Sequence, residues 1–204
     1  MRFYAEVILP GLCDLSMRSR HLVPYRKRVV GAARGRVLEI GVGSGLNLPF
    51  YSEDVFEIFG LDPSPRLLAM ASRAAKSASA LVTFIEGSAE EIPLETKSID
   101  TAVTTWTLCT VPHAEAALAE LRRTLKPGGR LLFVEHGLAP DERVRYWQEF
   151  LAPLWTRVSG GCHLNRPVGR MIQNAGFKFE RLETGYAPGP KPWTYFYQGS
   201  ARVR

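Results

Sequence analysis

The fold is decided by ten residues near the start of the chain, Leu38-Glu39-Ile40-Gly41-Val42-Gly43-Ser44-Gly45-Leu46-Asn47. An apolar run ends there in three alternating glycines, which let the backbone turn sharply and approach a ligand without interference from Cβ atoms. Because ligands of open α/β sheets bind beyond the carboxyl ends of the strands, we expect this loop to hold a ligand.

Short apolar runs alternate with stretches of helical spacing along the rest of the chain. Several runs are apolar on both faces, as is typical of parallel strands covered by helices. The sequence therefore predicts an α/β fold with a doubly wound, mostly parallel sheet and an antiparallel C-terminal hairpin. The expected strands cover residues 36–40, 55–61, 81–85, 99–105, 130–135, 177–184 and 193–202.

The helical stretches between these runs carry recognisable starts and stops. Ser64 is a good N-cap with Pro65 at the first helical position. A stripe that begins at Ala114 is expected to stop and turn at residues 126–129, Lys-Pro-Gly-Gly. A later helix is expected to be broken or kinked at Pro153. In the first 35 residues one or two helices are expected to pack on the core through a shared apolar face, formed by Tyr4, Ile8, Leu12 and Leu15.

Length and composition favour one domain over residues 1–204. The chain has 204 residues, 46% hydrophobic and 23% charged, which is ordinary globular usage. We expect an N-terminal helical lid (1–35), a cofactor-binding core (36–136), and C-terminal helices with a hairpin (137–204). Three cysteines without paired ligand spacing predict neither a disulfide framework nor a metal site. Since the N-terminal region contains no long apolar run, we expect a cytoplasmic protein.

The positive charge is concentrated at the N-terminus. Residues 1–36 carry eight Lys/Arg and two Asp/Glu, whereas residues 37–204 carry 18 of each, so the formal net charge of +6 lies in the first segment. Such a segment is either the solvated face of a helix or a peripheral contact with a membrane surface. No nucleic-acid-binding signature accompanies it, and we expect no nucleic acid partner.

The spacing around the glycine loop indicates the type of cofactor. Asp62 ends the second expected strand, 21 residues after Gly41, where a carboxylate can accept hydrogen bonds from ribose hydroxyls. Leu46 occupies the position that a dinucleotide fingerprint reserves for a small residue, so a pyrophosphate fits poorly. S-adenosylmethionine needs the same close approach, and Glu39 could bind its ammonium group. The absence of a Tyr-x-x-x-Lys pair also disfavours a nicotinamide-dependent oxidoreductase.

Four motifs in order resemble those of class I S-adenosylmethionine-dependent methyltransferases: residues 39–45, 61–64 (Leu-Asp-Pro-Ser), 86–90 (Glu-Gly-Ser-Ala-Glu) and 125–129 (Leu-Lys-Pro-Gly-Gly). The resemblance implies a Rossmann-like sheet of seven strands in the order 3-2-1-4-5-7-6. It also implies a cofactor site, in which residues 88 and 89 flank the adenine and residues 105 and 106 lie near the methionine portion. The expected cofactor-binding residues are Tyr4, Glu39, Gly41, Gly43, Gly45, Asn47, Asp62, Pro63, Ser64, Gly87, Ser88, Ala89, Thr105 and Trp106.

A second, shorter resemblance lies outside this core. Trp155 and residues 161–166, Gly-Cys-His-Leu-Asn-Arg, are similar to the methyltransferase-like family that includes the mammalian alkyl thiol S-methyltransferases. The sequence departs from those members at His163, where a second cysteine is expected, and in having no long hydrophobic N-terminal anchor. The leading expectation is therefore methyl transfer to a small thiol. A thiol is already a few per cent thiolate near neutral pH, so it tolerates the lack of an obvious base.

Two histidines are candidate catalytic residues. His136 directly follows the fifth expected strand, so it should lie beside the cofactor as a base or orienting group, or else bond to a loop carbonyl. His163 lies in the segment of the second resemblance and is expected to line the acceptor pocket.

Other functions stay open at this point. They are N- or C-methylation of a phospholipid head group or other small molecule, and a cofactor-bound regulatory protein without turnover. We expect a monomer or homodimer.

Overall fold

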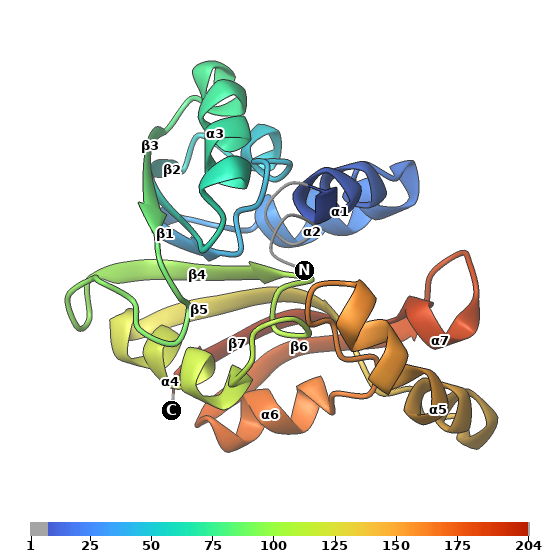
Figure 1. Ribbon diagram of the computed structural model, residues 1–204. Helices are drawn as coiled ribbons and strands as arrows, with labels where there is room; N and C mark the ends of the chain where they lie inside the picture. The colour runs from blue at the N-terminus through green and yellow to red at the C-terminus, as the bar shows by residue number, and fades with distance from the viewer. Residues whose placement is uncertain (1–7, 204) are drawn as a thin grey trace.

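The structure is a computed structural model that describes residues 8–203 (Figure 1). Its centre is one sheet of seven strands in the order β3-β2-β1-β4-β5-β7-β6. Strands β1 to β5 pair in parallel, whereas β7 pairs antiparallel with both β5 and β6. This arrangement confirms the expected fold, including the antiparallel hairpin. The strands are β1 (Gly35–Ile40), β2 (Val55–Asp62), β3 (Leu81–Glu86), β4 (Ile99–Thr105), β5 (Leu125–His136), β6 (Phe177–Tyr186) and β7 (Tyr195–Val203).

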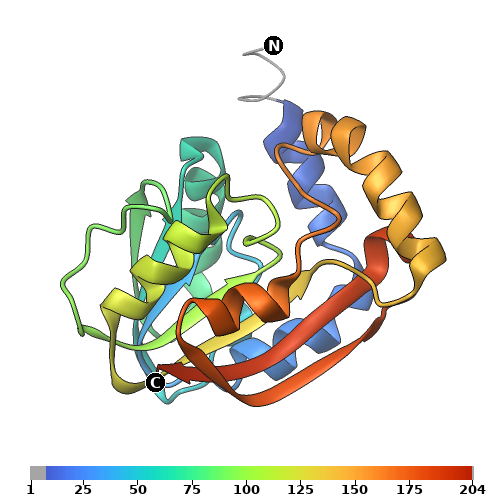
Figure 2. The ribbon, with the colours of Figure 1, turned by 90° about the horizontal axis from the view of Figure 1, so that it is seen from below.

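Helices cover both faces of the sheet. Helices α4 and α6 pack on one face with the larger apolar core, and α2 packs on the other with the smaller core. Helices α1 and α5 both lie beyond the sheet, at the end toward which the arrow of β4 points (Figure 1, Figure 2). The helices are α1 (Leu9–Met17), α2 (Val23–Val30), α3 (Pro65–Ala74), α4 (Ala114–Thr124), α5 (Glu142–Val158), α6 (Val168–Asn174) and α7 (Lys191–Thr194), with short 3₁₀ turns η2 (Arg20–Leu22), η3 (Leu48–Phe50) and η4 (Ala75–Ser77).

Local sequence explains where the helices begin. The Ser64 hydroxyl accepts a hydrogen bond from the backbone N–H of Leu67 at 3.3 Å, which caps α3 with Pro65 in its first turn. The apolar stripe of α4 is buried against the sheet as the periodicity predicts.

An expected turn between two elements is wrong. The Lys-Pro-Gly-Gly stretch is not a turn between elements, because α4 ends at Thr124 and β5 begins at once. Ile99 pairs with Leu125 and Thr101 with Arg130, so residues 126–129 form an irregularity inside the strand. At Pro153 the expectation is a break or a kink: the break is wrong, because α5 runs through Pro153 as one helix, and the kink stays a prediction. The ring of Pro153 is exposed, so it meets solvent rather than packed neighbours.

The expectation that α1 packs through its apolar face is also wrong. Ile8, Leu12 and Leu15 are 42%, 50% and 70% exposed, and Leu9 and Pro10 face the protein instead. Tyr4, the fourth member of that face, lies outside the described residues. Within residues 8–203, none of the helices has the length and apolar character needed to cross a bilayer.

Candidate functional site

The glycine loop after β1 adopts backbone conformations that require glycine. Gly41 and Gly43 have φ angles of 65° and 56°, in the left-handed region. A Cβ atom on Gly41 would overlap the side chain of Thr107, whereas one on Gly43 would meet only a carbonyl oxygen at 3.9 Å. The loop is therefore closely packed on its inner side and open in front of Gly43, where a ligand can approach. Gly45 (φ 80°) completes the loop, beside α3.

Asp62, at the end of β2, holds this loop in place. Its Oδ2 accepts a hydrogen bond from the backbone N–H of Gly43 at 3.0 Å, and its Oδ1 accepts one from Ser64 at 2.9 Å. Burial raises the pKa of Asp62, and the two backbone donors oppose that rise. Each carboxylate oxygen has a further lone pair, so both can still accept from a ribose. Pro63 follows and is exposed.

The expected adenine segment lies next to this carboxylate. Asp62 pairs with Glu86 at the end of β3, and the backbone N–H of Gly87 donates to the Asp62 carbonyl at 3.3 Å. Ser88 is exposed and its hydroxyl accepts from the N–H of Glu90, whereas Ala89 is buried. The structure thus brings the second and third sequence motifs together at one edge of the sheet.

A buried polar network joins Glu39, Asn47 and Thr105 behind the loop. The Asn47 amide Nδ2 donates to Glu39 Oε1 at 2.6 Å and to Thr105 Oγ1 at 2.9 Å. The Tyr51 hydroxyl donates to Glu39 Oε2 at 2.7 Å, and Arg26 Nη1 donates to Asn47 Oδ1 at 2.6 Å. The carboxylate of Glu39 therefore has two protein donors, and an ammonium group would share it with them.

Sequence reasoning missed two members of this network, Tyr51 and Arg26. Arg26 belongs to the basic segment but is only 5% exposed, so it is an exception to a solvated face. Burial lowers its pKa to about 10, opposed by the charge of Glu39. Burial also raises the pKa of Glu39 to about 7, opposed first by the hydrogen bonds from Tyr51 and Asn47. No local motif distinguishes Arg26 from its basic neighbours.

Trp106, directly after β4, is held in a strained conformation. Its φ of 52° is unusual for a bulky residue, and such outliers are concentrated at functional sites. The guanidinium of Arg26 lies 4.8 Å from the centre of its ring, and Phe196 packs edge-on at 5.7 Å. Among the described residues, the buried indole nitrogen of Trp106 has no hydrogen-bond partner.

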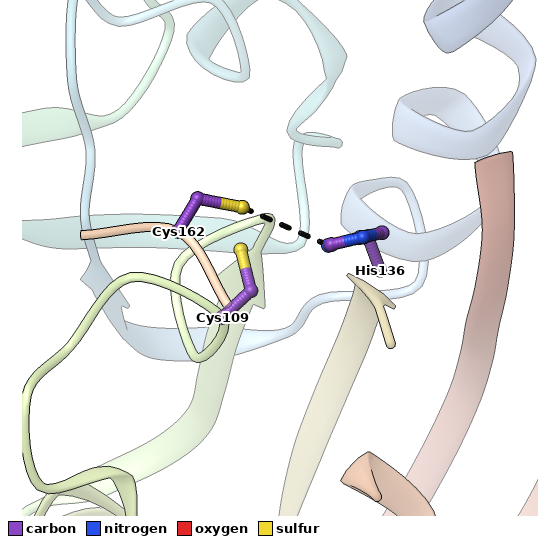
Figure 3. Close-up of side chains that lie close together, drawn as sticks. All are labelled: Cys109, His136 and Cys162. Carbon is purple, nitrogen blue, oxygen red and sulfur yellow. Dashed lines mark hydrogen bonds between the residues drawn. The ribbon is translucent and has the colours of Figure 1, made fainter. Parts of the chain in front are cut away.

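His136 ends β5 and meets two cysteines from distant segments (Figure 3). Its Nδ1 lies 3.8 Å from Sγ of Cys162, and the ligand-type atoms of Cys109, His136 and Cys162 all lie within 4.8 Å of one another. His136 is 5% exposed, and its Nε2 has no hydrogen-bond partner among residues 8–203. We call these three residues the Cys–His–Cys cluster.

His163 does not join this cluster. Its backbone N–H donates to the carbonyl oxygen of Cys109 at 2.8 Å, and its ring Nδ1 lies 3.3 Å from the same oxygen. The residue therefore contacts the backbone of Cys109, whereas His136 contacts the thiol of Cys162.

Buried charges hold the loop that carries Cys109. Glu135 is fully buried, and its Oε1 accepts from the Thr104 hydroxyl at 2.7 Å and from the N–H of Thr107 at 3.0 Å. Arg166 donates to the carbonyls of Leu108, of Val111 at 2.6 Å and of Pro112 at 3.1 Å. Both termini of this loop are therefore fixed relative to β5 and to residues 161–166.

The two thiols of the cluster differ in acidity. The neighbouring side chain of Cys109 lowers the pKa of Cys162, and burial opposes that shift. The same contact, together with burial, raises the pKa of Cys109. No spacing rule signals this cluster, because the two cysteines are 53 positions apart in the sequence; only the resemblance at residues 161–166 pointed to Cys162.

Helix α1 lies beside the glycine loop. The Ser44 hydroxyl donates to Asp14 Oδ1 at 2.5 Å, and the side chain of Leu9 contacts Gly160, just beyond α5. The Asp14 hydrogen bond and the Leu9 contact, rather than the exposed apolar face, therefore hold α1 beside the glycine loop. A separate surface hollow of about 890 Å³, lined by residues of α4 and the start of β5, contains none of the expected site residues.

Comparison with known proteins agrees with this geometry. Residues 38–133 match a family described as a methyltransferase domain. The chain is 34% identical over 184 residues to the thiol S-methyltransferase TMT1B of Rattus norvegicus, covering 88% of this chain and 74% of that protein. It is 34% identical over 109 residues to a phosphatidylethanolamine N-methyltransferase of Cereibacter sphaeroides, covering 52% of this chain and 53% of that protein.

Solved structures show the same fold. A methyltransferase of Thermotoga maritima, described as a possible histamine N-methyltransferase, aligns with a TM-score of 0.69. The alignment covers 98% of this chain and all of that one at 22% identity, so the likeness concerns the fold alone.

Proposed function

We propose that this chain methylates a thiol. The chain belongs to the family of S-adenosylmethionine-dependent methyltransferases that includes the thiol S-methyltransferases, and the proposal starts from that membership. The chain is an S-adenosylmethionine-dependent methyltransferase, as the sequence motifs predict. The proposal concerns how its residues hold the cofactor and which nucleophile receives the methyl group.

The residues around the glycine loop fit S-adenosylmethionine. The open face at Gly43 accommodates a close ligand, and Asp62 keeps acceptor capacity for the ribose hydroxyls. The carboxylate of Glu39 supplies negative charge for an ammonium group at the end of β1. When bound, the cofactor supplies a methyl group on a sulfonium sulfur. The proposed cofactor-binding residues among those described are Glu39, Gly41, Gly43, Gly45, Asn47, Asp62, Pro63, Ser64, Gly87, Ser88, Ala89, Thr105 and Trp106.

The observation that carries the choice of a thiol is the Cys–His–Cys cluster at the ends of β4 and β5. Its members are polarisable sulfur and imidazole groups, and Cys109 follows the expected methionine-binding residues by only three positions. A soft nucleophile such as a sulfur matches this lining better than an alcohol, which needs a strong base.

The two histidines have different proposed roles. His136 is the proposed catalytic residue, because its free Nε2 and its place in the cluster let it contact the acceptor. His163 is a proposed positioning residue, since its ring and backbone both face the carbonyl of Cys109.

A matched set of acceptors tests the choice of nucleophile. Benzyl mercaptan, benzylamine and benzyl alcohol share one apolar body and differ only in the reacting atom. We expect the methyl thioether as the main product by mass spectrometry, together with S-adenosylhomocysteine. His136→Ala should reduce its formation, whereas His113→Ala, at an exposed position before α4, should not. N-methylbenzylamine as the main product would contradict the proposal.

We also propose that basic residues of segment 1–36 contact a membrane surface peripherally. Arg20 and Lys27 are exposed there, and so are the apolar residues Leu12 and Leu15 of α1. Helix α5 exposes Trp147 and further apolar side chains. Basic and aromatic side chains together suit an anionic lipid surface. This contact would give the enzyme access to apolar acceptors dissolved in lipid.

A further inference from the structure

We propose that Cys109, His136 and Cys162 bind a zinc ion and leave a fourth coordination position open for the sulfur of the acceptor. The inference rests on the proposed function, because it names how the site would activate a thiol. It differs from the expectation drawn from the sequence, where the cysteine spacing predicts no metal site. The fold brings together ligands that the chain keeps far apart (Figure 3).

The distances suit a tetrahedral ion. Zinc binds sulfur at about 2.3 Å and imidazole nitrogen at about 2.0–2.1 Å, so neighbouring ligand atoms in a tetrahedron are about 3.5–3.8 Å apart. Cys162 Sγ and His136 Nδ1 are already 3.8 Å apart. The other two pairs of ligand atoms lie within 4.8 Å of each other. A side-chain rotation that moves a sulfur by about 1 Å brings them to the separation of tetrahedral ligands.

Three protein ligands are the number found at catalytic zinc sites. Structural zinc sites are closed by four protein ligands, whereas catalytic sites use three and keep one position for water or substrate. Among residues 8–203, only Cys109, His136 and Cys162 contribute a His, Cys, Asp or Glu ligand atom to this cluster. Two cysteines and one histidine also give a soft donor set, which favours zinc over magnesium or calcium.

The surroundings of the cluster orient its ligands. The Cys109 backbone is fixed by His163, and the loop before it is fixed by Glu135 and Arg166. Such outer contacts usually accompany metal ligands and set their direction. If Nδ1 of His136 binds the metal, its Nε2 carries the proton and points away from the ion, toward the place of an outer partner. That atom is buried and has no partner among the described residues.

The charge balance of the site also favours a cation. Cys109 is buried and Cys162 is half-buried, so two thiolates without a bound cation would be costly there. A divalent ion bound by two thiolates forms a neutral unit, which can be buried at much lower cost. The ion would therefore stabilise the ionised ligands against their buried surroundings.

The chemical step follows from this arrangement. The acceptor thiol binds at the open position and releases its proton to solvent, which leaves a zinc-bound thiolate. A lone pair of that sulfur attacks the methyl carbon and forms the new carbon–sulfur bond. The bond from the methyl group to the sulfonium breaks, and its electron pair returns to that sulfur. The products are a methyl thioether and neutral S-adenosylhomocysteine, and no oxidant or reductant is consumed.

Zinc binding to the whole protein tests the site. The reduced protein is freed of metal with a chelator, and zinc is added in competition with a chromophoric chelator. We expect one zinc ion per chain, with affinity reduced on the order of a hundredfold or more in Cys109→Ser, Cys162→Ser and His136→Asn. Cys13→Ser and His113→Asn are matched controls outside the cluster and should bind zinc as the unchanged protein does. Circular dichroism melts verify that each variant is folded.

Cobalt supplies a readout that is independent of activity. Co²⁺ bound by two thiolates should give charge-transfer absorption in the near ultraviolet, and benzyl mercaptan should shift the visible bands if its sulfur enters the open position. A thiol-reactive reagent should label Cys13 at an unchanged rate while zinc protects Cys109 and Cys162. Absence of zinc binding, or binding that survives all three ligand substitutions, would overturn the proposal. Formation of a Cys109–Cys162 disulfide in place of metal binding would overturn it as well.

The failure of this inference can be told apart from failure of the proposed function. Full methylation of benzyl mercaptan by protein without metal would overturn the zinc site and leave thiol methylation standing. One bound zinc, held by the cluster in a protein that methylates only benzylamine, would support the metal site and overturn the thiol as acceptor.

Discussion

The side-chain amide of Asn47 donates to Glu39 Oε1 over 2.6 Å and so ties the end of the glycine loop to the strand that precedes it. The same amide reaches Thr105 on the neighbouring strand, and its oxygen accepts from Arg26 on α2. Three elements of the proposed cofactor site therefore depend on one side chain.

Replacement of Asn47 by alanine should loosen all three elements. Glu39 and Arg26 are both buried, and each would lose a hydrogen bond without gaining contact with water. We expect a loss of about 1–3 kcal/mol in the free energy of unfolding, measured by denaturant titration, and weaker S-adenosylmethionine binding by calorimetry. Asn174→Ala, at the exposed end of α6, is the control and should change neither quantity. Unchanged cofactor affinity in the Asn47 variant would refute this role.

Asp62→Asn should weaken cofactor binding by about 1–3 kcal/mol. The amide of Asn has one acceptor oxygen and one NH₂ donor. That NH₂ group would face the backbone N–H of Gly43 or of Ser64, so a hydrogen bond to the loop is lost, and one acceptor for the ribose hydroxyls is lost as well. Isothermal calorimetry of the two proteins measures the difference. Asp54→Asn removes an equal charge at a largely exposed position and should leave the affinity as it was. Equal losses in both variants would mean that only the net charge matters.

Stability and cofactor binding should both depend on the ionisation of Glu39. Its pKa is raised from 4.5 to about 7 by burial, so the folded protein retains a proton that the unfolded chain has lost. The free energy of unfolding should therefore fall as the pH rises from about 4.5 to about 7, by on the order of 3 kcal/mol, and then level off.

Cofactor affinity should change in the opposite direction over the same range. An ionised Glu39 attracts an ammonium group, so binding should strengthen between pH 6 and pH 8 and release a proton. Calorimetry in buffers of different ionisation enthalpy detects that proton. Glu39→Gln should remove both pH effects, and a variant that keeps them would assign them to another group.

Helix α1 should act as the expected lid through its contact with Ser44. Ser44→Ala removes the hydrogen bond to Asp14 that links α1 to the glycine loop. We expect faster hydrogen exchange in α1 and faster release of S-adenosylhomocysteine in stopped-flow measurements. Ser16→Ala, on the exposed side of the same helix, is the control. If release is equally fast in all three proteins, α1 is not a lid.

Vesicle binding should depend on the exposed aromatic residues of α5. Trp147 and Phe150 are 51% and 65% exposed, so their replacement by serine should not disturb the core. We expect the double variant to co-sediment several-fold less with anionic vesicles, and added salt to weaken binding of the unchanged protein. Phe56→Ser alters an equally exposed residue on β2 and should have no effect. If Phe56→Ser reduced vesicle binding more than the double variant did, the membrane contact would lie elsewhere.

The sequence predicted the sheet because its signals are local. The parallel strands contain short apolar runs, and Ser64 with Pro65 marks the start of α3. The expectations failed where tertiary contacts decide. Leu12 and Leu15 look like a core-facing stripe, yet Asp14 and Leu9 turn that stripe to solvent. Residues 126–129 look like a turn, yet they form an irregularity inside β5, between the positions at which β5 pairs with β4.

The site residues also fall into those that local motifs predict and those that only the tertiary fold reveals. Glu39, Gly43 and Asp62 belong to short motifs with fixed spacing, so their neighbourhood could be anticipated. Arg26 has the same side chain as its exposed neighbours, and only the fold shows that it is buried against Asn47. The Cys–His–Cys cluster joins three segments that no spacing rule connects, because crossovers of the sheet bring them together.

The most direct measurement of the central claim uses an acceptor that carries both competing nucleophiles. An aromatic aminothiol is incubated with the enzyme and a donor whose methyl group is labelled with deuterium, and the product is fragmented in a mass spectrometer. The thiol-methylation account predicts that the label lies on sulfur. A label found on nitrogen, with the thiol left free, would contradict it.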